Sequence, residues 1–203
     1  FTNASKLGGT PIGLVGDIVM REATNLDEAE AILRAHKPIG CWTYLIADGK
    51  SRELLCWEED PDRRAARRIR DESATFAYSN IYLDEALAKT ERAVYGSYWR
   101  HNEGRFRRAR TMLEESYGEI DPQRLAELLG DEGEGECRIS RAIGMMMTTA
   151  SVVFAPEDGL VWVGTGQTPT SHGTYECFDL KGERHAPEHG TLHVGDAEAP
   201  ASR

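Results

Sequence analysis

Blocks of helical pattern alternate with blocks of strand pattern along this chain, and this order constrains the fold more than any other feature. Apolar residues recur at helical spacing between Thr10 and Pro38, and strand patterns follow from Trp42 to Ser79. A second helical block, from Tyr98 to Gly130, precedes a second strand block, from Thr148 to Phe178. Antiparallel strands that are covered by such helices predict a layered α+β fold.

Three local signals mark where the predicted helices begin. Thr10-Pro11 combines a capping residue with a proline at the first helical position, and Thr24-Asn25 precedes an acidic first turn. Asp121-Pro122 starts a short helix that ends at Gly130. Five arginines crowd the predicted helix at 98–117, and we expect them to form a solvated face with acidic partners.

The predicted strands are short and are separated by turn residues. The Asp48-Gly49 pair is a hairpin signal between the first two strands. Residues 131–136 read as an exposed loop. The predicted strands are Trp42–Ala47, Glu53–Glu58, Ala65–Ile69, Thr75–Ser79, Thr148–Phe154, Leu160–Gly164 and Thr174–Phe178.

The two ends of the chain differ in pattern. Residues 1–181 read as part of one domain, whereas residues 182–203 are rich in Gly, Pro and Ala and read as a flexible tail. The segment Phe1–Ser5 reads as a strand, and its first residue is not Met. We therefore expect an upstream segment, and we expect the chain to be stable only with that partner.

Composition excludes several classes of partner. The chain has 34 acidic and 24 basic residues, a net charge of −10, which disfavours nucleic acid and anionic lipid as partners. No apolar run approaches the ~20 residues that span a bilayer, and no signal-peptide pattern is present. The four cysteines form no C-x-x-C pair, so free thiols in the cytoplasm are expected.

Three in-chain sites for chemistry can be weighed from the residues alone. His185, His189 and His193 recur every four residues, but the intervening Pro and Gly disfavour a helix, so we predict a polar tail and no metal. Gly40-Cys41 is either a self-cleaving junction that frees an N-terminal Cys or the start of a buried strand. Thr2 becomes an N-terminal nucleophile only if Phe1 is removed.

A series of motifs carries a family resemblance over about residues 1–180. The motifs run in order from Gly40–Asp48 through Glu58-Glu59-Asp60-Pro61, Tyr78-Ser79-Asn80, the arginine-rich segment 105–113, Cys137-Arg138, Thr148–Phe154, Val161–Gly164 and Pro169. In this order and spacing the chain resembles the isopenicillin-N acyltransferase family of autoproteolytic acyltransferases and hydrolases. That family belongs to the N-terminal-nucleophile hydrolases and is akin to the choloylglycine hydrolases.

The resemblance implies an αββα sandwich, of which this chain supplies the C-terminal part. The family precursor cleaves itself before a cysteine, which then attacks amides or thioesters. That cysteine lies upstream of the segments matched here, so the resemblance places the nucleophile on an upstream segment or a second chain. No cofactor is implied, and coenzyme A thioesters are the implied acyl donors.

The resemblance also assigns candidate site residues. Asn80 matches an asparagine that serves the oxyanion, although Ile81 stands where the family has His, and Asn3 matches a second active-site asparagine. Arg138 follows Cys137 as in the family motif, and Tyr82 is a further candidate for substrate binding. Met146 replaces a family arginine, which is consistent with an apolar acyl pocket or with core packing.

Two functions of different classes follow from these observations. The first is a cysteine amidohydrolase or acyltransferase that acts on a linear amide or an acyl thioester. The second is a non-catalytic binding or oligomer subunit that keeps the fold without the nucleophile. A Gly-Cys junction upstream of Phe1 would favour the enzyme.

Overall fold

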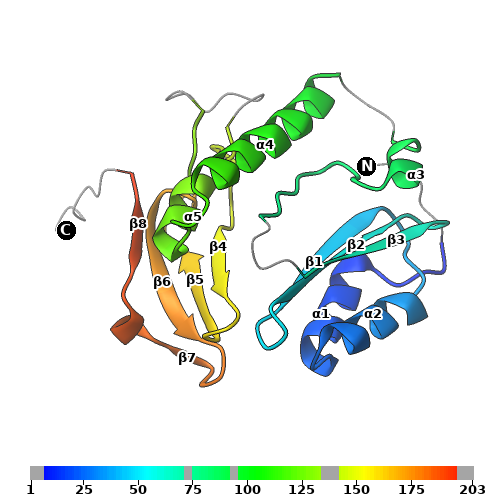
Figure 1. Ribbon diagram of the computed structural model, residues 1–203, viewed down its shortest axis with the longest axis horizontal. Helices are drawn as coiled ribbons and strands as arrows, with labels where there is room; N and C mark the ends of the chain where they lie inside the picture. The colour runs from blue at the N-terminus through cyan, green and yellow to red at the C-terminus, as the bar shows by residue number, and fades with distance from the viewer. Residues whose placement is uncertain (1–6, 71–74, 92–95, 134–141, 196–203) are drawn as a thin grey trace. The chain divides into compact units, whose positions relative to one another are not determined.

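The computed structural model describes residues 7–70, 75–91, 96–133 and 142–195, and side chains from residue 100 within the third range. These residues form helices and antiparallel sheets, so the predicted α+β class is confirmed. The chain divides into two compact units (Figure 1). The first contains Phe1–Ala74 and Asn80–Val94, and the second contains Thr75–Ser79 and Tyr95–Arg203.

The first unit is a three-stranded antiparallel sheet with α1 and α2 on one face (Figure 1). The strand order is β1-β2-β3, and Trp57 in the central strand is opposite Tyr44 on one side and Ala66 on the other. Its elements are α1 (Ile12–Glu22), α2 (Leu26–Ala35), β1 (Trp42–Asp48), β2 (Glu53–Glu59), β3 (Arg64–Ile69) and α3 (Glu85–Ala88).

The core of this unit lies between the sheet and the two long helices. Val15 and Val19, one turn apart on α1, are buried against the same cluster as Leu33 of α2. Leu55 and Trp57 of β2 complete the cluster from the sheet. Burying a side chain of this size contributes about 1.5–3 kcal/mol, so the apolar stripes explain why the helices lie on the sheet.

Local side chains fix the start of α2 as predicted. Asn25 Oδ1 accepts a hydrogen bond from Glu28 N at 2.9 Å, and the Glu28 carboxylate accepts one from Thr24 N at 2.8 Å. Asn25 is therefore the N-cap, and the Glu28 carboxylate binds the N–H of the residue before it. The predicted Thr10 cap of α1 is wrong, because Pro11 is the N-cap and no side chain caps it. Thr10 instead donates its backbone N–H to Lys37 O at 2.7 Å.

The second unit places a helix on a five-stranded antiparallel sheet. The order is β4-β5-β6-β7, and β8 also pairs with β6, beyond the end of β7. Its elements are α4 (Gly96–Glu115), α5 (Pro122–Leu129), β4 (Val152–Ala155), β5 (Leu160–Gly164), β6 (Gly173–Asp179), β7 (Arg184–His185), the 3-10 helix η1 (Pro187–His189) and β8 (Leu192–Val194).

Aromatic and aliphatic side chains from the sheet build the core of this unit beneath α5. Trp162, Tyr175 and Val153 are buried in one cluster with Ala126 of α5. The buried Tyr175 hydroxyl lies 2.7 Å from Ser151 Oγ, which satisfies the polar atoms of both side chains. Asp121 caps α5 by accepting from Arg124 N at 2.7 Å, as predicted.

The flexible tail predicted at 182–203 is wrong for the residues that the structure describes there, which extend to 195. β8 adds Leu192 and Val194 to the core of the second unit through its pairing with β6. His185, His189 and His193 lie on β7, η1 and β8 respectively. β7 and β8 are only two and three residues long, which is too short for an alternating pattern to be recognised in the sequence.

Two further predictions need correction. Thr75–Ser79 is not a strand; the Ser79 hydroxyl instead donates to Asn102 O of α4 at 2.8 Å. The loop at 131–136 is not simply exposed where it is described, because Asp131 accepts two hydrogen bonds from Arg108, at 2.8 and 3.0 Å. Acidic partners for the α4 arginines are confirmed by this contact and by the Arg107–Glu103 and Arg110–Glu114 pairs.

Candidate functional site

Three consecutive acidic side chains are buried where β2 ends. Glu58, Glu59 and Asp60 are 4%, 2% and 1% exposed. A carboxylate that is removed from water destabilises a protein unless hydrogen bonds or opposite charges compensate it. The partners of these three carboxylates therefore show which segments of the first unit they stabilise.

Glu58 binds the backbone that precedes α3. Its two carboxylate oxygens accept from Leu83 N at 2.6 Å and from Asp84 N at 2.9 Å. Burial raises the pKa of Glu58, and the nearby Asp84 adds to this, whereas the two N–H donors and Arg67 act in the opposite direction. The neighbouring Tyr82 N donates to Glu91 Oε1 at 2.6 Å. Three successive N–H groups thus meet carboxylates.

Glu59 and Asp60 have partners of other kinds. Glu59 accepts from Trp57 Nε1 at 2.8 Å, and Arg64 Nε lies 3.7 Å from the same carboxylate. Burial raises the pKa of Glu59 against these two contacts. Asp60 closes the turn after β2 by accepting from the backbone N–H groups of Asp62 and Arg63, both at 2.7 Å.

Tyr82 is held by the same end of β2. Its side chain is buried, and its hydroxyl donates to Glu59 O at 2.6 Å. The phenol therefore has a visible structural role, which joins the segment after Asn80 to the sheet. Substrate binding by Tyr82 stays a prediction.

Asn80, the predicted oxyanion donor, begins the segment that follows Ser79 into the first unit. It is half-buried, and the next residue, Ile81, is buried. Asn80 and Tyr82 are thus two residues apart on one anchored segment. Met146 lies in the second unit and is 71% exposed, so it does not pack in a core. Asn3 and Arg138 lie outside the described residues.

The described cysteines differ in their fitness as nucleophiles. Only the thiolate form attacks a carbonyl. Burial raises the pKa of Cys56 to about 12, with a further contribution from Glu58, and burial also raises the pKa of Cys177. Both are therefore thiols at neutral pH. Cys41 is half-buried and directly precedes β1, and Cys137 lies outside the described residues, as does Thr2.

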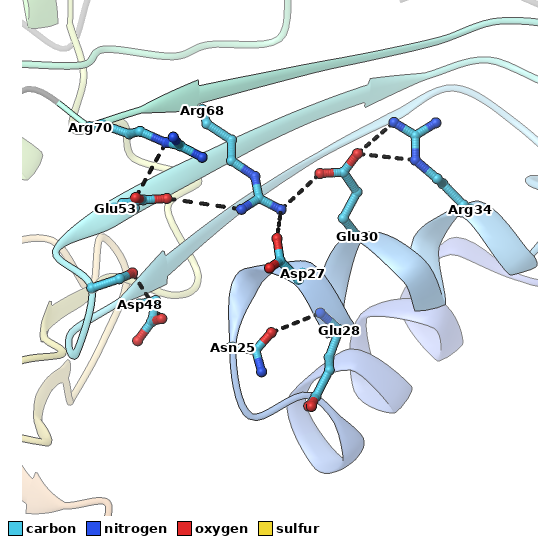
Figure 2. A network of polar contacts seen from close by, with 10 residues as sticks. Asn25, Asp27, Glu28, Glu30, Arg34, Asp48, Glu53, Arg68 and Arg70 are labelled. Carbon is cyan, nitrogen blue, oxygen red and sulfur yellow. Dashed lines mark hydrogen bonds and ion pairs between the residues drawn. The ribbon is translucent and has the colours of Figure 1, made fainter.

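A second polar region lies at the opposite end of β2, where a network of ion pairs joins α2 to β3 (Figure 2). Arg68 is its centre and contacts Asp27 at 2.7 Å and Glu30 at 3.0 Å. A pocket of about 240 Å³ opens beside this network. Its lining residues are Asn25, Leu26, Asp27, Asp48, Ser51, Glu53, Arg68 and Arg70.

The charges around this pocket are already paired with one another. Glu53 lies 3.3 Å from Arg70 and 3.9 Å from Arg68. Asp48 accepts from Lys50 N and from Ser51 Oγ, both at 2.9 Å, and these bonds stabilise the hairpin turn. The network therefore explains how α2, the hairpin and β3 hold together, and it offers no unsatisfied group to a ligand among these residues.

Within the described residues, no group of three or more His, Cys, Asp and Glu side chains is arranged to hold a metal ion. No helix in the described ranges is both long and apolar enough to cross a membrane.

Sequence reasoning missed the contacts of Glu58 and Glu91. The signal for Glu58 was present, because the acidic run follows the apolar Leu54-Leu55-Cys56-Trp57 within one predicted strand. Alternation along a strand places Cys56 and Glu58 on the same face, and a carboxylate on a buried face requires donors. The donors come from residues 83 and 84, and this long-range contact has no local signal.

Comparisons with known proteins add one finding. A family model described as "Acyl-coenzyme A:6-aminopenicillanic acid acyl-transferase" matches residues 1–169. No curated protein and no solved structure matches the chain. The matched range includes the buried acids at the end of β2 and the segment that carries Asn80 and Tyr82.

Proposed function

The chain belongs to the acyl-coenzyme A:6-aminopenicillanic acid acyl-transferase family, and from this we propose that it is part of a cysteine acyltransferase or amidohydrolase. The match over residues 1–169 is the observation that carries the proposal. The substrate is a linear amide or an acyl thioester, with coenzyme A thioesters as acyl donors. The fold is the αββα sandwich of N-terminal-nucleophile hydrolases, formed with an upstream segment or a second chain.

The reaction proceeds through an acyl-enzyme. The α-amine of an N-terminal cysteine takes the thiol proton, and the sulfur attacks the acyl carbonyl carbon. The carbonyl oxygen becomes an oxyanion, and the Asn80 side-chain N–H donates to it. Collapse of this intermediate breaks the bond to the leaving amine or thiolate, which receives the proton. Water or an acceptor amine then attacks the new thioester and releases the acyl group.

Asn80 fits the role of oxyanion donor because its surroundings are ordered. A donor accelerates acyl transfer when it is already oriented toward the charge that develops in the transition state. The buried Ile81 and Tyr82 that follow Asn80 restrict its backbone. Asn3 supplies a second donor in this proposal, and Arg138, Tyr82 and Met146 stay candidates for substrate binding, each within its own unit.

The nucleophile of the proposed enzyme is a cysteine on an upstream segment, freed by autoproteolysis, or on a second chain. The raised pKa values of Cys56 and Cys177 support this, because neither residue supplies a thiolate at neutral pH. Cys41 directly precedes a strand that pairs with β2 along its whole length, so cleavage before it would cut the chain at the edge of the sheet. The proposed location is the cytoplasm, where such thiols stay reduced.

The complete enzyme should release coenzyme A from a simple thioester. The test mixes the protein, with its nucleophile-bearing segment or chain, with hexanoyl-coenzyme A and measures free thiol with and without an acceptor amine. We expect turnover in both mixtures. An acceptor amine that increases the rate of thiol release indicates acyl transfer, and an amine that leaves the rate unchanged indicates hydrolysis. An enzyme that turns over neither this thioester nor a hexanoyl amide would contradict the proposal.

A further inference from the structure

The backbone between Asn80 and α3 is held by carboxylates in a way that the proposed reaction does not by itself require. The N–H groups of Tyr82, Leu83 and Asp84 point to Glu91 or Glu58, at 2.6, 2.6 and 2.9 Å. Two of these N–H groups, those of Leu83 and Asp84, donate to the two oxygens of a single carboxylate, that of Glu58.

This contact is unusual in its energetics. Glu58 is 4% exposed, so its charge has been removed from water, and two charge-assisted hydrogen bonds are needed to offset that loss. Such a buried carboxylate is sensitive to substitution, because two half-buried N–H donors would lose their acceptor. A carboxamide has one acceptor oxygen, so it satisfies one of the two N–H groups and opposes the other.

The contact with Glu58 also restricts the backbone near Asn80. Leu83 N, which makes the shorter of the two bonds, is three residues from Asn80, and Ile81 and Tyr82 between them are buried. Tyr82 is anchored separately through its hydroxyl to Glu59 O, on the same end of β2. Asp84 also caps α3 by accepting from Ala86 N and Leu87 N, at 2.9 and 3.0 Å, so the segment cannot slide toward the helix.

We propose that Glu58 is a positioning residue, whose carboxylate fixes the 82–84 backbone and thereby the direction in which Asn80 donates. This inference rests on the proposed function, because it assigns a purpose to the segment through the oxyanion donor. Glu58 does not contact the substrate in this account. Its effect on turnover passes through Asn80, and this distinguishes it from a residue that only stabilises the first unit.

A double-mutant cycle in the complete enzyme tests this dependence. Glu58→Gln should lower kcat for hexanoyl-coenzyme A by about 10- to 100-fold, since a misplaced catalytic group costs up to about 10²-fold. KM should change little. In an Asn80→Ala background the same substitution should change kcat by less than about twofold, because the donor that it positions is already absent.

A matched control comes from the other end of the same strand. Glu53 is also a partly buried carboxylate of β2, but its contacts are to Arg68 and Arg70. Glu53→Gln should leave kcat unchanged, although it removes ion pairs. If Glu58→Gln fails to fold, Glu58→Asp replaces it in the cycle, because it keeps the charge and shortens the reach to the donors.

Hydrogen exchange gives a second measurement that needs no activity. At least one of the Leu83 and Asp84 amides should exchange at least tenfold faster in Glu58→Gln, and those of β1 and β2 should stay protected. Equal losses of kcat in the two backgrounds, or unchanged exchange at residues 83 and 84, would overturn the inference. An Asn80→Ala enzyme with normal turnover would instead refute the oxyanion donor, and the exchange result would still decide whether Glu58 holds the segment.

Discussion

At the scale of single residues, the end of β2 shows how buried charge can organise a site. Glu58, Glu59 and Asp60 are consecutive, yet each satisfies a different part of the chain: the segment before α3, the Trp57 ring, and the turn after the strand. An uncompensated carboxylate at any of these positions would cost several kcal/mol. The three therefore specify the local structure around Asn80 more strictly than apolar residues of similar size would.

Asn80→Ala tests the proposed oxyanion donor. Removal of one preorganised donor typically costs on the order of 10²–10³ in turnover, so kcat for hexanoyl-coenzyme A in the complete enzyme should fall by about that factor. KM should change far less, because the donor acts on charge that develops during attack. Since Asn80 is half-buried, the melting temperature should stay within a few degrees of the wild-type value. Wild-type turnover in the variant would mean that Asn80 is structural.

The raised pKa of Glu59 predicts how the stability of the protein depends on pH. Its folded pKa lies above the ordinary value of 4.5, because burial outweighs the contacts from Trp57 and the nearby Arg64 and His36. As pH rises above 4.5 the unfolded chain ionises first, so the free energy of unfolding falls until the folded group also ionises. Glu59→Gln keeps an acceptor for Trp57 and removes this titration.

The measurement is urea unfolding of both proteins at a series of pH values. The wild type should lose stability relative to Glu59→Gln as pH rises from 4.5 to the folded pKa, and the difference should then stay constant. The comparison isolates this group from carboxylates such as Glu30, whose pKa is lowered and which act in the opposite sense. A wild type that gains stability relative to the variant over this range would contradict the assignment.

At the scale of elements, β8 provides the clearest test of the architecture. Leu192 is 9% exposed and packs in the core of the second unit, so Leu192→Ala should destabilise the protein by about 2 kcal/mol. Leu180, at the end of β6 and 48% exposed, is the matched control, and its replacement should cost less than about 0.5 kcal/mol. If thermal unfolding shows equally small losses of stability for the two variants, the flexible tail predicted from the composition would be supported.

The predictable elements are those whose signals are local. The Asn25 cap of α2 and the Asp48 turn both depend on residues at most three positions apart, and both appear where the sequence indicates them. Misassigned segments depend on distant partners. Ser79 is held by a carbonyl of α4, and the three-residue β8 pairs with β6 across a turn and η1, so neither leaves a signal long enough to recognise in its own sequence.

The residues of the candidate site also differ in whether the sequence alone could identify them. The resemblance indicates Asn80 as the oxyanion donor, and the structure places Asn80 and Tyr82 on one anchored segment. Glu58 was part of a quoted motif but had no role, because its donors lie 25 and 26 residues further along the chain. The contact between strand end and loop becomes visible only when the fold brings these residues together.

At the scale of the whole molecule, family membership is the finding that joins these features to a reaction. The match covers residues 1–169, so it includes the helices and strands of the first unit and extends to β4 and β5 of the second. A family of acyltransferases requires a nucleophile, a donor for the oxyanion and a site for the acyl group. The described residues supply a candidate for the donor, and two of their cysteines are unsuited to be the nucleophile.

The central claim is that an acyl group passes through a cysteine other than those described in this chain. The most direct measurement is peptide mapping by mass spectrometry after the complete enzyme is mixed with hexanoyl-coenzyme A and quenched in acid, which preserves a thioester. One hexanoyl adduct is expected, on the N-terminal cysteine of the upstream segment or second chain. An adduct on Cys41, lost together with turnover in Cys41→Ala, would contradict the central claim and make Cys41 the nucleophile.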